Sequence, residues 1–289
     1  MLANMRTDAQ DGSAWSDLNR PPLRVGPLRR ALPDGEHPAW RAHDVVAQTQ
    51  SSNADVMARA RAGEAAGYVL VADQQTAGRG RLGRAWTTPP RAALAVSVLL
   101  RPTAPMQRWA WLGQLAGLAV VDALTRTCGV PARLKWPNDV LVPDGGDPDA
   151  PYRKVCGILA EAAPPVVVVG VGINVSQSEA ELPVPTATSL LLAGGATLDR
   201  DSVTRAYLRA LATRYAAWDA AAGDPRASGL GAAYREACLT IGVSVRVLVT
   251  GSPDLLGQAE GVDDEGRLLV RTPDGVDHAL AAGDVVHVR

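Results

Sequence analysis

The chain has 289 residues, of which 47% are hydrophobic and 20% charged, so it has the length of about two domains and the composition of a globular protein. Its formal net charge of −1 excludes a global field that would attract nucleic acid or an anionic membrane, so any basic site must be local. Three widely spaced cysteines without a CxxC pair, and four scattered histidines, exclude a disulfide framework and argue against a metal site held by protein ligands.

The N-terminus has no apolar run of signal-peptide length, and its aspartates argue against an organellar transit peptide. The most apolar run, Val166 to Ile173, is far shorter than the ~20 residues that span a bilayer. We therefore expect a soluble, cytoplasmic protein with no membrane contact.

Residues 1–36 combine Pro, Gly, Arg and Asp without periodicity, which predicts a mostly disordered leader. Its prolines leave no room for the helices of a helix-turn-helix domain, so we expect no DNA binding. Residues 37–236 form the next predicted domain. Its pattern predicts strands at 43–48, 68–73, 92–100, 132–136, 155–162 and 166–171. Helices are predicted from the cap at 51–53 to about 65, and at 106–128, 188–192, 201–221 and 227–237.

Residues 237–289 have a different pattern. Short apolar runs at 243–249, 258–262, 268–271, 278–280 and 285–288 are separated by Gly, Pro and Asp. Five short strands with such turns are typical of a small β-barrel. We place the domain boundary near Glu236.

The most informative stretch is residues 78–86, GRGRLGRAW, which holds three glycines, three arginines and a tryptophan. Glycine lets the backbone approach a ligand closely, and arginine offers a planar, permanently charged fork for phosphate or carboxylate. The tryptophan adds a flat face for a planar base. A disordered RNA-binding repeat is the alternative, but the segment occurs once and lies between two predicted strands.

Further polar segments stand at predicted strand ends, where binding sites are usually built. They are Ser51-Ser52-Asn53, Gln75, Lys135 to Asp139, Lys154 and Gly172 to Asn174. Each also has a structural interpretation: the serines as helix caps, the lysines as solvated charges, the glycines as relief of crowding, Asn174 as a turn residue. GxSxG, Walker and GxGxxG motifs are absent, and Cys156 lies inside an apolar strand. With many cations and no protein nucleophile, the site suits a reaction in which the substrate is the nucleophile.

Together the segments GRGRLGRAW, KWPNDVL, KVCGILAE and GVGINV, in this order, resemble the biotin protein ligases (biotin–acetyl-CoA-carboxylase ligases) over roughly residues 43–289. The resemblance implies an α+β fold, with a mixed sheet flanked by helices as in biotin and lipoate ligases and an SH3-like C-terminal β-barrel. It implies a ligase that uses ATP and Mg²⁺ to convert biotin to biotinyl-5′-AMP. The acceptor would be a lysine of the biotin carrier domain of an acetyl-CoA or acyl-CoA carboxylase. Without a DNA-binding domain the ligase would be monofunctional, and its oligomeric state stays open.

The resemblance also implies site residues. For biotin they are Ser51, Ser52, Gln75, Gly78, Arg79, Arg81, Lys154, Gly157 and Gly172. For ATP and the adenylate they are Arg79, Arg81, Arg84, Trp86, Lys135, Asn138 and Asn174. The catalytic residues would be Arg81, Lys135, Lys154 and Asp139, and Mg²⁺ would arrive with ATP rather than in a protein-only site. The loop 78–84 would close over the adenylate, Trp86 would pack on adenine, and Asp139 would orient the acceptor lysine.

Three departures from the family pattern stand out. Ser52 replaces the more usual Thr, Cys156 replaces a small apolar residue, and the loop 143–152 is longer than typical, which affects the placement of Lys154. Two alternatives remain: a lipoate or octanoate ligase on the same fold, and a non-catalytic nucleotide or RNA binder.

Overall fold

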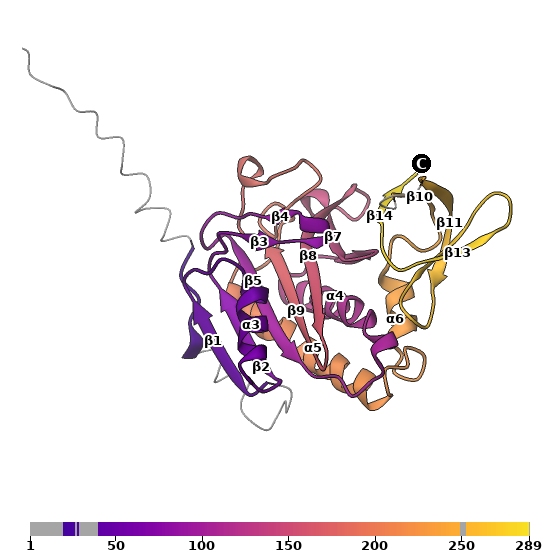
Figure 1. Ribbon diagram of the computed structural model, residues 1–289. Coiled ribbons are helices and arrows are strands. Elements are labelled where there is room, and N and C mark those ends of the chain that lie inside the picture. Colours follow the sequence, from indigo (N-terminus) through magenta and orange to yellow (C-terminus); the bar gives the residue numbers. More distant parts are fainter. Residues whose placement is uncertain (1–19, 27, 29–39, 249–252, 289) are drawn as a thin grey trace, which may run out of the picture.

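One mixed sheet forms the larger part of the computed structural model, which describes residues 20–26, 28, 40–248 and 253–288 (Figure 1). Within these residues the sheet has the strand order β1-β2-β5-β9-β8-β7-β6. The first pair is parallel and the other pairs are antiparallel, which confirms the expected mixed sheet. In chain order, the strands are β1 (Ala42–Val46), β2 (Tyr68–Ala72), β5 (Ala93–Leu100), β6 (Arg133–Lys135), β7 (Asp139–Pro143), β8 (Tyr152–Ala163) and β9 (Val166–Asn174).

Helices cover both faces of this sheet, because alternate strand residues point to opposite sides. In β2, Tyr68 and Leu70 pack in a small cluster that includes Val56 of helix α3 (Ser52–Arg61). Val69 and Val71 instead belong to the main core. Helices α4 (Trp111–Ala123) and α5 (Arg200–Ala220) supply that core on the opposite face (Figure 1). Burial on both faces explains why the central strands are unbroken apolar runs.

The helices begin and end for local reasons. α3 is capped by the Ser51 side chain, which accepts a hydrogen bond from the N–H of Ala54. It ends at Arg61, before Gly63 with φ +95°, and is therefore shorter than the predicted helix to 65. α4 continues into a π-helical turn at Leu124–Cys128, so the long apolar segment is helical almost throughout. No helix in the described part of the chain has the length and apolar character to cross a membrane.

The C-terminal part is an antiparallel sheet, reached through helix α6 (Leu230–Ala237). Its strands are β10 (Ser244–Leu248), β11 (Leu255–Val262), β12 (Leu268–Arg271), β13 (Asp277–Leu280) and β14 (Asp284–His287). The order is β13-β12-β11-β10-β14, and among the described residues β13 and β14 do not pair. The small barrel that we predicted is therefore an open sheet. It joins the first domain through hydrogen bonds such as that from Gln114 Nε2 to the Gly266 carbonyl, at 2.8 Å.

Two elements differ from the predictions. Lys135 pairs with Asp139, so the segment between them is the turn of a β6–β7 hairpin and β7 is a strand that we did not predict. Residues 188–192 form turns rather than a helix. There the N–H of Leu190 donates to the Asn174 carbonyl at 3.1 Å, which ties these turns to the end of β9.

Part of the predicted leader is packed against the domain. Leu23 and Leu28 are buried, and the N–H of Leu23 donates to Asp73 Oδ1 at 3.3 Å. Residues 20–26 and 28 of the predicted leader therefore contact the domain through two buried leucines and a backbone hydrogen bond. Residues 1–19, 27 and 29–36 of the same prediction lie outside the described residues.

Candidate active site

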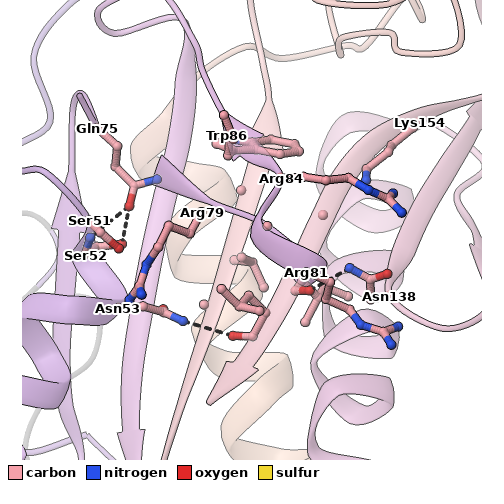
Figure 2. A pocket seen from close by; sticks show the side chains of 18 of the residues that line it. Ser51, Ser52, Asn53, Gln75, Arg79, Arg81, Arg84, Trp86, Asn138 and Lys154 are labelled. Atoms are coloured by element: carbon pink, nitrogen blue, oxygen red, sulfur yellow. Dashed lines mark hydrogen bonds between the residues drawn. The ribbon is translucent and has the colours of Figure 1, made fainter. Parts of the chain in front are cut away.

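A pocket opens where α3 begins and where the long hairpin β8–β9 passes beneath residues 78–86. Most of its labelled side chains converge on it from loops and strand ends (Figure 2). Asp284 of the C-terminal sheet also lines it, so both domains contribute. The predicted site residues in its wall are Ser51, Ser52, Gln75, Arg79, Arg81, Arg84, Trp86, Asn138, Lys154, Gly157 and Gly172.

The polar floor of the pocket is built by Ser51, Ser52 and Gln75. The loop that carries Gln75 is held against the chain before α3, since Thr76 N–H donates to the Thr49 carbonyl at 2.9 Å. As a result, Gln75 Oε1 accepts from the Ser52 backbone N–H at 2.8 Å and lies 2.9 Å from Ser52 Oγ (Figure 2). Ser51 caps the helix, which confirms the structural interpretation, and it also lines the pocket, so its predicted contact with a ligand stays a prediction.

Beneath this floor lies a buried polar network that the sequence interpretation missed. Ser97 Oγ is 2.8 Å from Ser52 Oγ and 2.7 Å from Asn53 Oδ1. The Asn53 amide donates to the Leu159 carbonyl at 3.1 Å and to the Glu161 carboxylate at 2.8 Å. Ser97 is the one polar residue in the run ALAVSVLL of β5, and this was the available signal.

Residues 78–86 form a small hairpin of β3 (Gly78–Arg79) and β4 (Ala85–Trp86) around a tight turn. A Cβ at Gly78 would lie 2.5 Å from the Trp86 carbonyl oxygen, so this position needs glycine. Arg79 pairs with Glu161 at 3.3 Å, and Arg84 pairs with Asp284. The hairpin is thus fastened to the main sheet at one end and to the C-terminal sheet at the other.

The ring of Trp86 lies on the backbone of the β8–β9 hairpin. A Cβ added at Gly172 would be 2.6 Å from Trp86 Cε2, and one added at Gly157 would be 3.0 Å from Cζ3. The glycines predicted to contact biotin therefore make room for the indole ring in this structure. Lys154 Nζ is 5.7 Å from the ring centroid, within cation–π range.

The cations of the site face carboxylates. Lys154 Nζ is 2.6 Å from Asp139 Oδ1, across the neighbouring strands β8 and β7. Burial lowers the pKa of Lys135, Asp139 acts against this, and Lys154 adds to it. Burial likewise lowers the pKa of Arg81, against the pull of Asp284 and Asp139. Such partly desolvated cations are suited to hold phosphoryl charge.

Some predicted residues are not in the pocket wall. Lys135 and Asp139 stand behind Lys154, and Gly78 lies at the base of the small hairpin. Asn174 is buried, and its amide donates to the Thr188 carbonyl at 2.9 Å and accepts from Gln177 at 2.9 Å. The structure therefore uses both ends of the Asn174 amide for internal bonds and does not bring it to the pocket.

Two features bear on other chemistries. Cys156 is fully buried, and burial raises the pKa of its thiol, which is the expected state of an inert core cysteine. Within the described residues, no group of three or more His, Cys, Asp or Glu side chains is arranged to hold a metal ion.

The family models that match this chain are those of biotin or biotin/lipoate ligases, and two curated relatives are ligases as well. The biotin/lipoate A/B protein ligase family model matches residues 45–178, and the biotin protein ligase C-terminal domain model matches residues 240–288. The chain is 46% identical to a biotin–[acetyl-CoA-carboxylase] ligase of Mycobacterium tuberculosis, over 94% of this chain and 98% of that one. It is 34% identical to a bifunctional ligase/repressor of Bacillus subtilis, over 86% and 73% of the two chains.

A solved structure agrees in fold. The biotin protein ligase of Aquifex aeolicus in complex with biotin and ATP superposes with a TM-score of 0.64 at 28% identity. The match covers 86% of this chain and 98% of that one.

Proposed function

The chain belongs to the biotin protein ligase family, and on this premise we propose that its pocket activates biotin with ATP and transfers it to a carrier lysine. The protein is an ATP-dependent ligase, whose acceptor is the biotin carrier domain of an acetyl-CoA or acyl-CoA carboxylase. The observation that carries the assignment to this pocket is the convergence of a polar floor, an arginine hairpin and Lys154 on one cavity.

In the first step, a carboxylate oxygen of biotin attacks the α-phosphorus of ATP. The bond from this phosphorus to the oxygen bridging the β-phosphate breaks, and pyrophosphate leaves with biotinyl-5′-AMP remaining bound. Ser52 and Gln75 hold the ureido ring at the floor, while Arg81 and Lys154 hold the carboxylate and the phosphate. Mg²⁺ that accompanies ATP neutralises charge on the pyrophosphate. Positioning and electrostatics supply the catalysis, because the substrate provides the nucleophile.

In the second step, the neutral amine of the acceptor lysine attacks the carbonyl carbon of the mixed anhydride. The bond from that carbon to the phosphate oxygen breaks and AMP leaves, while the amine loses a proton. Asp139 is the carboxylate suited to orient this amine, and Lys154 Nζ, 2.6 Å from Asp139 Oδ1, fixes its position.

The hairpin of residues 78–86 serves as the cover of the adenylate. With Arg79 and Arg84 fastened to opposite sides of the pocket, closure excludes water from the anhydride. Trp86, seated on Gly157 and Gly172, offers its outer face to adenine. Lys135 contributes charge from behind Lys154, and Asn138 contacts the nucleotide from the wall. Asn174 would contact the nucleotide only after its amide left Thr188 and Gln177.

We also propose that the enzyme is cytoplasmic and does not bind DNA. The described cysteines are all free and buried, which is typical of proteins from a reducing compartment.

The decisive experiment measures pyrophosphate release and labelling of a purified carrier domain. We expect both to require biotin and ATP. Lipoate in place of biotin should give neither product, which separates the biotin ligase from a lipoate ligase of the same family. Absence of pyrophosphate release with biotin, together with an unlabelled carrier, would refute the proposal. Salt-sensitive RNA binding without turnover would favour the non-catalytic alternative.

A further inference from the structure

A chain of three short oxygen–oxygen contacts runs beneath the pocket floor. It leads from Gln75 Oε1 to Ser52 Oγ at 2.9 Å, from there to Ser97 Oγ at 2.8 Å, and on to Asn53 Oδ1 at 2.7 Å. Ser97 is 0% exposed and Asn53 is 5% exposed. The protons that fill these contacts therefore have to come from the protein itself.

Both ends of this chain are fixed as acceptors. The Asn53 amide nitrogen donates to the Leu159 carbonyl and to the Glu161 carboxylate, which turns the amide oxygen toward Ser97. The backbone N–H of Ser52 donates to Gln75 Oε1 and fixes that oxygen in the same way. An amide oxygen has lone pairs and no proton, so neither end can donate.

The count of protons then decides the polarity of the floor. Three contacts share two hydroxyl protons, one from Ser52 and one from Ser97. Ser97 Oγ donates to the Asn53 oxygen at 2.7 Å, and within the described part of the chain it is the one protein group recorded as donating to that oxygen, so Asn53 takes the Ser97 proton, since an unfilled buried acceptor is costly. Ser52 keeps one proton for Gln75 or Ser97, and both lone pairs of its oxygen stay unfilled. Ser52 lines the pocket, so this surplus acceptor capacity is available to a ligand.

We propose that Asn53 is a specificity-determining positioning residue: by taking the proton of Ser97, it makes Ser52 an acceptor and selects a head group with N–H donors. The inference rests on the proposed function, in which the ureido ring of biotin brings two such groups. A dithiolane head group carries none, so the same floor disfavours it. The polarity is set by Asn53 and Ser97 together; Asn53 also lies in the pocket wall, whereas Ser97 does not.

Gly170 holds this arrangement in place. A Cβ there would lie 2.1 Å from Asn53 Oδ1 and 2.9 Å from its Cγ, so the amide lies directly on the backbone of β9. Gly170→Ala therefore displaces the Asn53 amide without changing Asn53 itself. Once Asn53 is displaced, the Ser97 proton is free to fill a lone pair of Ser52.

The test is a calorimetric comparison of ligands on the purified full-length chain. The probes are biotin and its cyclic carbonate analogue, in which oxygen replaces both ureido N–H groups. Desthiobiotin, which keeps both N–H groups and lacks the sulfur, controls for ring packing. We expect the wild type to prefer biotin over the carbonate by at least about 100-fold, because a site built around an N–H strongly rejects an analogue without it.

Three variants separate this role from a structural one. Asn53→Leu and Gly170→Ala should each reduce the biotin-to-carbonate ratio at least about tenfold, because Ser52 then accepts from Ser97. Ser97→Ala is the matched control within the same network: it leaves both Ser52 lone pairs unfilled. We therefore expect Ser97→Ala to weaken binding of both ligands but to keep their ratio within about threefold.

Each result has a defined meaning. A wild-type ratio below about tenfold overturns the inference, as does an unchanged ratio in whichever of Asn53→Leu and Gly170→Ala folds. An equal loss of ratio in Ser97→Ala also overturns it, since the network would then matter only for packing. Biotin-dependent pyrophosphate release with an unchanged ratio refutes this inference alone, whereas absence of release refutes the proposed function.

Discussion

Replacement of Gly172 by alanine should slow the adenylation of biotin, because the new methyl group displaces Trp86. The new Cβ would lie 2.6 Å from Trp86 Cε2, 2.7 Å from Nε1 and 2.9 Å from Cζ2. To restore an ordinary contact of about 3.4 Å, the ring has to recede by roughly 0.8 Å. A displacement of this size at a substrate-positioning group costs up to about 100-fold in rate, which corresponds to about 2.7 kcal/mol of transition-state stabilisation.

The measurement is the kinetics of pyrophosphate release. We expect Gly172→Ala to lower kcat/KM for ATP by between about tenfold and 100-fold, because in the proposed function Trp86 faces the adenine. Gly157→Ala should have a smaller effect, since its Cβ would lie 3.0 Å from Trp86 Cζ3 and needs a shift of only roughly 0.4 Å. Gly261→Ala, whose Cβ would meet nothing within 4 Å, is the control and should match the wild type.

The order of the three variants tests the reasoning. If Gly172→Ala keeps kcat/KM for ATP within about threefold of the wild type, the contact between Trp86 and β9 does not position the nucleotide. The same holds if Gly157→Ala is the more damaging of the two. If Gly172→Ala instead lowers kcat/KM for biotin and leaves kcat/KM for ATP unchanged, Gly172 contributes to biotin binding, as the resemblance to the family implied.

Three further predictions concern charges. Lys154→Ala should reduce the rate of pyrophosphate release by about 100-fold or more, because the variant lacks the preorganised cation that we propose at the phosphate. A circular dichroism spectrum like that of the wild type would show that the variant is folded. A rate within about tenfold of the wild type would show that Lys154 does not act in the site. Arg200→Met should lower the free energy of unfolding by about 3–5 kcal/mol, because the Asp73 carboxylate, 5% exposed and 2.8 Å from Arg200, stays buried without its cation and keeps the neutral Leu23 N–H as a donor. A second change, Asp73→Leu, should recover part of that loss in a denaturant titration, and no recovery would mean that the loss is not electrostatic. A hydrogen bond from Arg20 lowers the pKa of Glu181 from 4.5 to about 2, so this pair stabilises the fold above pH 4.5 and the contribution is lost as the pH falls toward 2. Glu181→Gln should therefore flatten the acid side of a plot of Tm against pH, and an unchanged slope would show that the pair does not contribute.

The layers of the fold could be predicted because they rest on local patterns. The continuous apolar runs of β5 and β9 and the apolar length of α4 are buried as expected. The predictions that were wrong concern how strands pair. β7 is a strand because it pairs with β6 across a hairpin turn and with β8 on its other side, and the turn residues in the sequence hide that pairing. Whether five strands close into a barrel depends on pairing between the two edge strands of the sheet, here β13 and β14, which spacing does not encode.

For the candidate site, the sequence was sufficient to predict the residues on its loops but not the buried residues beneath them. Its loops carry short, unusual segments, and the arginines, Trp86 and Lys154 stand together in the pocket as expected. Ser97 and Asn53 escaped because a serine in a strand and an asparagine at a helix start have ordinary structural explanations. Asn174 was placed with the nucleotide from its motif, yet Gln177 and Thr188, folded back by the turns after β9, occupy its amide.

If the hairpin of residues 78–86 covers the ligand as proposed, the ion pair between Arg84 and Asp284 couples ligand binding to the C-terminal sheet, because Asp284 is the first residue of β14. Thermodynamic reciprocity then applies: a ligand that tightens the cover must raise the stability of β14 by the same coupling free energy, and a partner that grips β14 must alter ligand affinity equally. Amide hydrogen exchange along β14 would therefore report occupancy of a pocket in the other domain. With this coupling, the small sheet, which supplies Asp284 to the pocket wall, would also respond to the ligand that the pocket holds.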